Sequence, residues 1–573
     1  MSNPQIVSSP APPRWLPWTW LGLLWAAIFA IAISGYPNLV DNERRVGGYI
    51  MDVVQNGHWA IQQDVTGDIA SKPPMLTWIA SVAVLCFGRI NRFSIYLPSA
   101  LATLGVTWLL FAVGRKHFGW RAGFIGAFAY LLSYVSAMQV VTARYDGLFA
   151  FPVTLAAVAA YRAWTTGRGW TAFWLANTLG TLVKGPLGLI LSGGGLIATF
   201  WERRSGNRVP LRGSHWLGVA LYLVFCGGWF ALAYIRLGHG VLDKMLGKEL
   251  VDHAVKDGSH LPGQGFWEPI WNTFTNFMPW SMVAGVALWR IIKHPAADIE
   301  ERRFERFLFC WYAVGLLFFS LAAHQRGRLT WPLVPALAPL VGREIANWLK
   351  NVSTRKMLQA TTALSAVVLL GFGVYHHSLR LHARPVQETL GMKYIADEIR
   401  AHVGEKFPIT YAGTLATDSP SFAVQFYLST LRRNADIKAA AGVLQGDLPA
   451  FVVVRNYPKL LGQVGTNTAL HELLRWPEKG DPLVRLVGNR PKLEPTESVE
   501  ACLGPTRLRL EHARLERTRD NEFFVTPLAK GAVVTLQNVS TNTVTVGVHW
   551  AAQAETMLAR KLAPAAVWRV TAP

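Results

Sequence analysis

The sequence has few charged residues and few cysteines for its length. Only 16% of its 573 residues are charged, whereas half are apolar. Its four cysteines show neither CxxC nor Cys/His spacing, which argues against a disulfide framework or a metal site of that type. The N-terminus lacks a short apolar region that ends in a cleavage site. We therefore expect the first apolar run to stay as a membrane anchor.

Sequence motifs for nucleotide binding and for common hydrolases are also missing. There is no GxxxxGK[ST], no GxGxxG behind an expected strand, no HExxH and no GxSxG. An Asp-x-Asp pair, of the kind that holds a metal and a nucleotide sugar, does not occur either. These absences argue against a nucleotide-sugar donor.

The sequence instead contains long stretches without charged residues, and it has 24 tryptophans. A helix needs about 20 mostly apolar residues to cross a bilayer, and windows of this kind recur along the first two thirds of the chain. We therefore predict a polytopic α-helical membrane protein with about 11 spans. The predicted spans are 15–40, 94–114, 122–143, 147–164, 169–183, 185–201, 213–235, 269–289, 306–323, 329–349 and 357–375.

The net charge of +21 fits a membrane orientation better than nucleic acid binding, because the basic residues lie mainly in short loops between spans. With a cytoplasmic N-terminus, and with 75–88 not crossing, the inner loops hold 18 Lys and Arg in 56 residues. The outer segments hold 13 in 95. This matches the positive-inside bias, whereas counting 75–88 as a span would invert every later loop. The tail after Tyr375 is then expected outside.

The segment "GDIASKPPMLTW" places Lys72 and two prolines directly before the apolar run 75–88. That run is too short to cross a bilayer comfortably. We predict an interfacial or re-entrant helix on the outer face, started by the two prolines. Lys72 is then fixed near the plane of the lipid phosphates.

The tail has the character of a soluble domain. Helix-like stretches (MKYIADEIRAHV, SFAVQFYLSTL) alternate with strand-like ones (FPITYAG, AFVVVRN), which predicts a small α/β domain over 379–500. The remainder, 501–573, is rich in strand-like segments separated by turn residues. Residues 1–14 are rich in Pro and Ser and are expected to be disordered.

With this orientation, charged residues from distant parts of the chain collect at the outer surface. Such charges often only anchor helix ends at the headgroups. However, Lys184 stands alone between two apolar runs, and ionisable residues at such depth are usually functional. The collected residues are Asp41, Glu43, Lys72, Arg144, Asp146, Lys184, His324, Arg326 and Arg328.

This combination of cations and carboxylates suits a lipid phosphate and a group that must be activated. A prenyl-phosphate sugar has its phosphate at this depth, and breaking the sugar–phosphate bond leaves negative charge on the phosphate. Lys72, Lys184 and the arginines would stabilise that charge. A carboxylate such as Asp41 could accept a proton from an acceptor hydroxyl.

The order of the motifs along the chain resembles a known family, the GT-C glycosyltransferases of the protein O-mannosyltransferase superfamily. The closer similarity is to the bacterial branch that contains the 4-amino-4-deoxy-L-arabinose (aminoarabinose) lipid A transferases, and it covers about residues 15–350. The segments that carry it are "DNERR", "NGHW", "SKPPMLTW", "FGRINRFSIYLPSAL", "FAVGRKHFGWRAG", "TARYDGLF", "TLVKGPLGLIL" and "FFSLAAHQRGRLTWPLVPALAPL".

The resemblance implies a GT-C fold with about 11–13 spans over 15–378, an outer loop 41–93 with juxtamembrane helices, and a periplasmic C-terminal domain. It also implies the bacterial inner membrane, a polyprenyl-phosphate sugar donor, and lipid A or another envelope acceptor. Together with the charged residues collected above, it predicts Asp41, Glu43 and Asp146 as catalytic. The residues predicted to bind the donor phosphate are Arg44, Lys72, Arg144, Lys184, Arg326 and Arg328.

The sequence departs from the family pattern at three places. The usual Asp-Glu pair reads Asp41-Asn42 with Glu43 one place late, Ser71 replaces a glutamate, and the later basic stretch reads "QRGRLTWP". These departures leave the acceptor and a divalent metal open; no other cofactor is implied. Protein or glycan glycosylation, transport of a lipid-linked sugar and a non-catalytic structural role also stay open. A transporter would need polar residues along a path across the bilayer.

Overall fold

The computed structural model describes residues 12–34, 39–40, 43–206, 209–245, 247, 264–323, 326–403, 409–413, 419, 421–429, 431, 433–446, 450–465, 468–492, 498–503, 506–511, 513–519, 522–527, 533–538, 541–549 and 557–571. The chain divides into two compact units. The helical unit comprises Met1–Tyr36, Asp52–Gln62 and Ile69–His382, and the sheet unit comprises Pro37–Met51, Gln63–Asp68 and Ala383–Pro573. Most of the segment 1–14, predicted to be disordered, lies outside the described residues.

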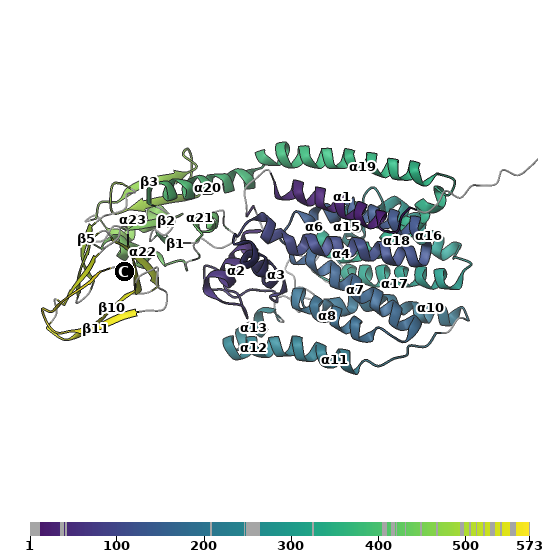
Figure 1. Cartoon of the computed structure of the whole chain (residues 1–573), viewed down its shortest axis with the longest axis horizontal. Coiled ribbons are helices and arrows are strands. Elements are labelled where there is room, and N and C mark those ends of the chain that lie inside the picture. The colour runs from purple at the N-terminus through teal and green to yellow at the C-terminus, as the bar shows by residue number, and fades with distance from the viewer. Residues whose placement is uncertain are drawn as a thin grey trace, which may run out of the picture. The chain divides into compact units, whose positions relative to one another are not determined.

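The helical unit is a bundle of apolar helices (Figure 1). A further helix, α2 (Glu43–Asn56), contributes residues to both units. The bundle contains α1 (Leu16–Ile33), α3 (Met75–Phe87), α4 (Arg92–Phe118), α5 (Trp120–Leu131), α6 (Tyr134–Val140), α7 (Tyr145–Thr166), α8 (Trp170–Lys184), α9 (Leu187–Gly193), η1 (Gly194–Ile197), α10 (Ala198–Arg204), α11 (Trp216–Tyr222), η2 (Leu223–Gly227), α12 (Gly228–Leu237), α13 (His239–Leu242), α15 (Glu268–Asn276), α16 (Ser281–Lys293), α17 (Ile299–Leu321), η4 (Gly327–Leu333), α18 (Val334–Trp348), α19 (Thr354–Val374), η5 (Tyr375–Leu379) and η6 (Arg380–His382).

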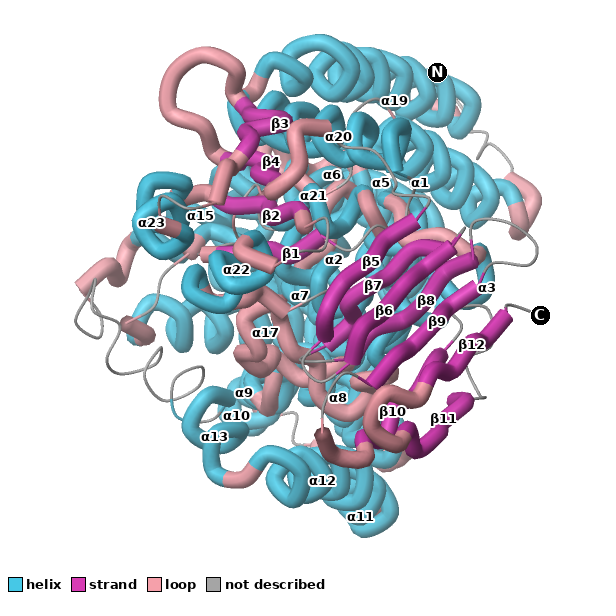
Figure 2. The backbone as a smooth tube through the Cα atoms, turned by 90° about the vertical axis from the view of Figure 1, so that its left-hand side faces the viewer, coloured by secondary structure: helices cyan, strands magenta, loops and turns pink. Residues whose placement is uncertain are grey.

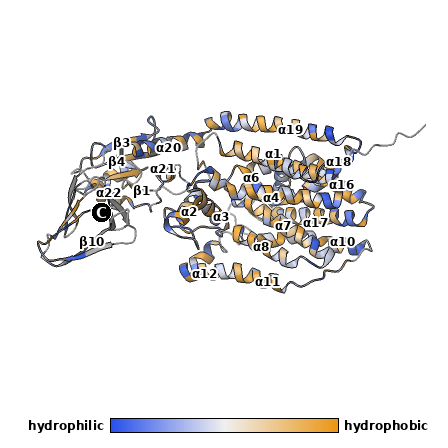
Figure 3. Cartoon of the chain, in the orientation of Figure 1, coloured by the Kyte–Doolittle hydropathy of each residue, from blue (hydrophilic) through white to orange (hydrophobic). Residues whose placement is uncertain are grey.

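Among the described residues, six helices are long and apolar enough to cross a membrane, or up to seven if the bent pair α5–α6 is one span. Figure 3 shows apolar residues running along these helices. The predicted polytopic helical membrane fold is therefore confirmed. The remaining predicted spans coincide with shorter or broken helical stretches, namely α8, α9–α10, α15–α16 and η4–α18. The number of 11–13 spans stays a prediction.

Small residues bring the central helices of the bundle into close contact. A Cβ atom added to Gly342 of α18 would lie 2.1 Å from the Ala122 carbonyl oxygen of α5. One added to Gly126 of α5 would lie 2.6 Å from the Ala338 carbonyl oxygen of α18. Close backbone approach of this kind is how helices associate in membranes, where lipid tails are as apolar as the side chains.

Charged side chains are nevertheless buried at the ends of α10 and α17. Glu202 is fully buried, and its Oε1 accepts a hydrogen bond of 2.5 Å from Nη1 of Arg306. Arg306 also donates to the Ser205 hydroxyl at 2.9 Å. A second group of paired charges joins α16, α17 and α18, and its members are Arg290, Glu301, Glu305, Arg343 and Glu344.

The sheet unit contains a four-stranded sheet with helices on both faces. The strand order is β1-β2-β4-β3, with β1 and β2 parallel and the other pairs antiparallel. Every residue of β2 is buried, as expected for a strand covered on both sides. Cluster contacts place α20 and α21 on one face, and α22 and α23 on the other. The bounds are α20 (Arg384–Val403), β1 (Ile409–Ala412), α21 (Phe422–Tyr427), α22 (Ile437–Leu444), β2 (Phe451–Val454), α23 (Tyr457–Val464), β3 (His471–Trp476) and β4 (Val484–Gly488).

The last part of the chain is made of strands, as the alternating sequence pattern predicts (Figure 2). A four-stranded antiparallel sheet has the order β12-β9-β6-β5, and β7–β8 and β10–β11 form two-stranded pairs. The first of these strands begins three residues before the predicted boundary at 501. The bounds are β5 (Ser498–Leu503), β6 (Thr506–Glu511), β7 (Ala513–Arg519), β8 (Glu522–Pro527), β9 (Val533–Asn538), β10 (Val544–His549), β11 (Met557–Leu562) and β12 (Val567–Thr571).

The buried Glu202–Arg306 pair yields a stability prediction. Replacing Glu202 by Leu leaves the Arg306 guanidinium buried beside an apolar group. Removing one partner of a buried pair lowers the free energy of unfolding by about 3–5 kcal/mol. Thermal unfolding of the full-length protein in detergent measures this loss.

Two variants serve as controls. Glu268→Gln removes an exposed carboxylate in the first turn of α15, so we expect a change below about 1 kcal/mol. Arg306→Met added to Glu202→Leu should recover most of the stability, because an apolar pair replaces both charges. Unfolding of Glu202→Leu at the wild-type temperature would contradict the structural role of the pair.

Candidate functional site: a carboxylate held between cations

Asp146 lies in the first turn of α7 and is 6% exposed. A carboxylate suits this position, because the unpaired N–H groups at a helix N-terminus carry partial positive charge. Arg144, the residue that caps the helix, makes no hydrogen bond with its side chain to the helix end.

Lys184 is the last residue of α8, which lies beside α7 (Figure 1). Gly185 and Pro186 follow and separate α8 from α9. The Lys184 ammonium group binds Oδ1 of Asp146, and it lies 5.7 Å from the centre of the Phe149 ring, over its face. Lys184, singled out in the sequence by its isolation, thus pairs with the predicted aspartate.

Arg328 approaches Asp146 from a third segment, η4. Its Nε lies 3.3 Å from Oδ2 of Asp146. The turn that carries it is held by the Asn276 amide of α15, which donates to the Gly327 carbonyl at 2.9 Å. Arg326 acts electrostatically on Arg328, and Arg144 acts on both Asp146 and Arg328. One carboxylate therefore lies among several cations.

Lys72 precedes α3, and Pro74 caps that helix as the sequence predicts. Two residues from the start of α3, Met75 and Trp78, pack with Leu182 in one apolar cluster. Leu182 is two residues before Lys184. The start of α3 therefore lies against the last turns of α8, the helix that supplies the Lys184 ammonium.

Glu43 and Arg44, two more of the predicted residues, belong to the sheet unit. Glu43 and Arg44 are both buried at the start of α2. Arg44 donates from Nε to the Leu39 carbonyl at 3.2 Å and from Nη2 to the Thr389 hydroxyl at 3.4 Å. These contacts tie the start of α2 to α20. Asp41 and His324 lie outside the described residues.

The arrangement around Asp146 can bind an anion better than it can abstract a proton. Both carboxylate oxygens already face cations, and nearby opposite charge favours the ionised form of a carboxyl group. The surplus of Lys and Arg over carboxylates leaves positive charge to be neutralised, as a phosphate would do. The described residues contain no group of three or more His, Cys, Asp or Glu placed to hold a metal ion.

A simpler reading of the sequence pairs Asp146 with its neighbour Arg144. The structure instead gives Asp146 the ion pairs with Lys184 and Arg328, which come from other helices. Two supporting residues had no distinguishing signal in the sequence: Phe149 is one of many aromatics in the spans, and Asn276 is one polar residue in an amphipathic stretch. Their positions become meaningful only through the tertiary contacts.

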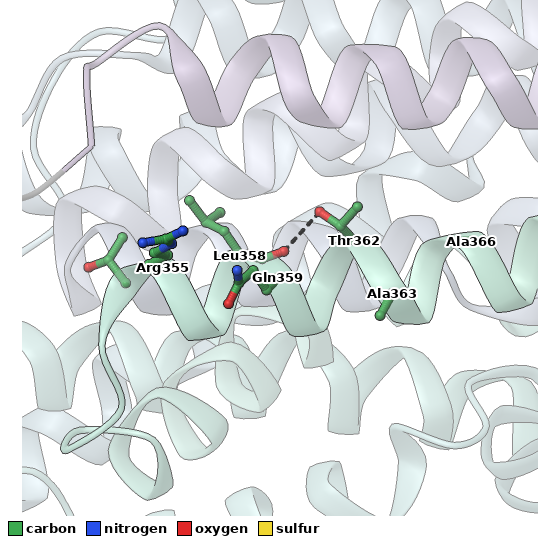
Figure 4. A pocket seen from close by; sticks show the side chains of 7 residues that line it. Arg355, Leu358, Gln359, Thr362, Ala363 and Ala366 are labelled. Atoms are coloured by element: carbon green, nitrogen blue, oxygen red, sulfur yellow. Dashed lines mark hydrogen bonds between the residues drawn. The ribbon is translucent and has the colours of Figure 1, made fainter.

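A separate groove of about 750 Å³ runs along α19 (Figure 4). It shares no lining residue with the group around Asp146. Thr362 on its wall donates to the Leu358 carbonyl of its own helix at 2.9 Å. The described residues that line the groove are Thr354, Arg355, Leu358, Gln359, Thr362, Ala363 and Ala366.

Part of the chain matches a known family model, and several known proteins are similar to it. Residues 71–231, which include Lys72, Asp146 and Lys184, match the family model described as dolichyl-phosphate-mannose-protein mannosyltransferase. The undecaprenyl phosphate-alpha-4-amino-4-deoxy-L-arabinose arabinosyl transferase 1 of Pseudomonas fluorescens is 24% identical over 66% of this chain and 67% of its own. The undecaprenyl phosphate-alpha-4-amino-4-deoxy-L-arabinose arabinosyl transferase of Pseudomonas paraeruginosa is 25% identical. That match covers 56% of this chain and 58% of the relative.

A solved structure shares the fold. ArnT from Cupriavidus metallidurans, crystallised with undecaprenyl phosphate, superimposes with a TM-score of 0.67 at 16% sequence identity. The match covers 84% of this chain and 100% of that one. The chain therefore has the fold of ArnT, and in sequence it resembles the arabinosyl transferases. It spans about two thirds or less of the two arabinosyl transferases compared above.

The site around Asp146 predicts a strong effect of Asp146→Asn on glycosyl transfer. The amide has no charge to hold Lys184 and Arg328, so both cations shift from the positions that they take in the structure. Misplacement of groups by about 1 Å can reduce a rate by about 10²-fold. We expect turnover in membranes to fall by about that factor at equal protein amounts.

The matched control is Glu268→Gln, which also replaces a carboxylate of the helical unit by an amide but at an exposed position. Its turnover should equal that of the wild type. Turnover of Asp146→Asn within about twofold of wild type would show that the ion pairs only anchor helix ends, as many ion pairs do for little gain.

Proposed function

We propose that the protein transfers a sugar from a polyprenyl-phosphate donor to lipid A at the periplasmic face of the bacterial inner membrane. The observation that carries the proposal is the position of Asp146 between Lys184 and Arg328. This cationic group lies at the ends of apolar helices, where the phosphate of a membrane-anchored donor would lie. The named substrate of the arabinosyl transferases and the ligand of the ArnT crystal support a polyprenyl phosphate.

The residues divide into two roles in this proposal. Lys72, Lys184 and the arginines Arg144, Arg326 and Arg328 bind the donor phosphate and stabilise the charge left on it when the sugar departs. Asp146 holds two of these cations in place. Asp41 and Glu43 serve the sugar or the acceptor, and Arg44 fixes the start of α2, of which Glu43 is the first residue.

The acceptor decides how much base catalysis is needed. A lipid A phosphate is already an anion and attacks without losing a proton. A protein or glycan hydroxyl must lose one, and Asp41 would then act as the base. The similarity to aminoarabinose transferases supports lipid A. A protein or glycan acceptor is the alternative that the next experiment tests.

Mass spectrometry of lipid A from cells with and without the protein tests the proposal. We expect a mass increase of one sugar residue that depends on the protein and disappears with Asp146→Asn. Unchanged lipid A in cells whose membranes still consume a polyprenyl-phosphate sugar would shift the acceptor to a protein or glycan. Membranes that consume no such donor would overturn the transfer reaction itself.

Lys72→Ala provides a second test of the phosphate role. Lys72 is a half-buried charged residue that precedes α3, so we expect normal expression and folding but loss of transfer. Product formation is measured in membranes with equal amounts of protein. Lys116→Ala, which removes an exposed lysine from the last turn of α4, is the control and should stay active. Activity of Lys72→Ala within about twofold of wild type would contradict the assignment of Lys72 to the phosphate. Loss of a contact of this kind lowers the rate by about 10²-fold or more.

A further inference from the structure

A row of buried hydroxyl groups follows one face of α4. Ser99, Thr103 and Thr107 are spaced by four residues and are all fully buried. Thr107 donates to the Thr103 carbonyl at 2.8 Å, a bond within its own helix. Ser99 and Thr103 differ from Thr107, because they also reach residues outside α4.

Gln139 of α6 is the partner of Thr103. Its Oε1 lies 2.8 Å from the Tyr130 hydroxyl and 3.3 Å from Oγ1 of Thr103. The Thr103 hydroxyl has a second acceptor, the Ser99 carbonyl at 2.9 Å. Its single proton can therefore be donated to only one of the two oxygens at a time. Gln139 is fully buried, and within the described part of the chain its Nε2 has no hydrogen-bond partner. A buried amide is unfavourable in an apolar bundle, so its presence calls for a role beyond packing.

Ser99 and Gln139 both touch the start of α7. The Ser99 hydroxyl donates to the Arg144 carbonyl at 3.3 Å. A Cβ atom added to Gly147 would lie 3.2 Å from both Cβ and Oγ of Ser99 and 3.6 Å from Cβ of Gln139. Gly147 directly follows Asp146. The two side chains therefore flank the turn that carries the carboxylate.

This turn has little else in its own sequence to fix it. The chain bends by 61° between α5 and α6, and a short non-helical segment leads from α6 to α7. The capping residue Arg144 gives no side-chain hydrogen bond to the helix end. Contacts with α4 and α6 therefore help to fix where α7 begins, together with its packing against α8.

We propose that Ser99, Thr103 and Gln139 are positioning residues for the transfer reaction. They hold the first turn of α7 so that the Asp146 carboxylate meets Lys184 and Arg328 in the geometry that serves the donor phosphate. This inference rests on the proposed function. Gln139 links the bent pair α5–α6 to α4 through its hydrogen bonds to Tyr130 and Thr103. The Ser99 hydroxyl then links α4 to the start of α7 through its hydrogen bond to the Arg144 carbonyl.

Two variants remove the hydrogen bonds with little change of shape. Ser99→Ala keeps the Cβ atom against Gly147, and Gln139→Met keeps the length of the side chain. We expect kcat to fall by about tenfold or more in each, with KM for the donor within about twofold, because the misplaced groups act on the transition state. Thr107→Val is the matched control: its hydroxyl is equally buried on the same helix but bonds only within α4. Its kcat should match wild type.

A triple variant separates positioning from mere loss of buried hydrogen bonds. Tyr130→Phe, Thr103→Val and Gln139→Met together remove the amide and its two hydroxyl partners, and such matched removal is often nearly neutral for stability. We expect the triple variant to regain the thermal stability lost in Gln139→Met while its kcat stays low. Recovery of kcat along with stability would overturn the positioning role.

A readout without substrate distinguishes failure of this inference from failure of the proposed function. Hydrogen exchange of the amides at 145–148, followed by mass spectrometry on the full-length protein, should be faster in Ser99→Ala and Gln139→Met and unchanged in Thr107→Val. Faster exchange in the two variants, together with a wild-type protein that transfers no sugar, would overturn the proposed function but keep the mechanical link. Unchanged exchange, or unchanged kcat in an active protein, would remove the link.

Discussion

The need to neutralise one buried carboxylate organises the helical unit. Asp146 lies among apolar helices, and an unpaired charge there is far less stable than in water. Lys184 from the end of α8 and Arg328 from η4 neutralise the Asp146 carboxylate. Three segments far apart in sequence must therefore meet at one point. The helix break after Lys184 and the hydrogen bond that the Asn276 amide donates to the Gly327 carbonyl both lie next to these cations.

The same constraint explains where the remaining charges lie. The long apolar helices carry few charges along their length, and the buried pairs around Glu202 and Arg343 occur at helix ends. A helix bundle in lipid gains little from apolar burial between helices, so small residues and paired polar groups hold it together. The contacts of Gly342 with α5 and of Arg306 with Glu202 are examples of these two means.

The sequence predicts the helices better than their mutual geometry. Apolar windows located the helices, since a span has a length and composition of its own. The run of four apolar residues in β2 and the prolines before α3 were equally readable. Lys184 stood out because it was alone. In contrast, the partner of Asp146 was not readable, because Arg144 is adjacent in sequence while Lys184 and Arg328 are adjacent only in space. The role of Gln139 likewise depends on the bend between α5 and α6.

The geometry also bears on how the chemistry is divided among the carboxylates. A carboxylate with a cation at each oxygen is strongly held in its ionised form and is a weak proton acceptor. Asp146 is thus suited to fixing the cations that meet a phosphate. Any proton transfer would need another group, for which we propose Asp41 or Glu43. If the acceptor is itself a phosphate, no proton has to move, and the surplus of cations can serve both anions. A cation-rich site with its central carboxylate already committed is therefore better matched to an anionic acceptor than to a neutral hydroxyl.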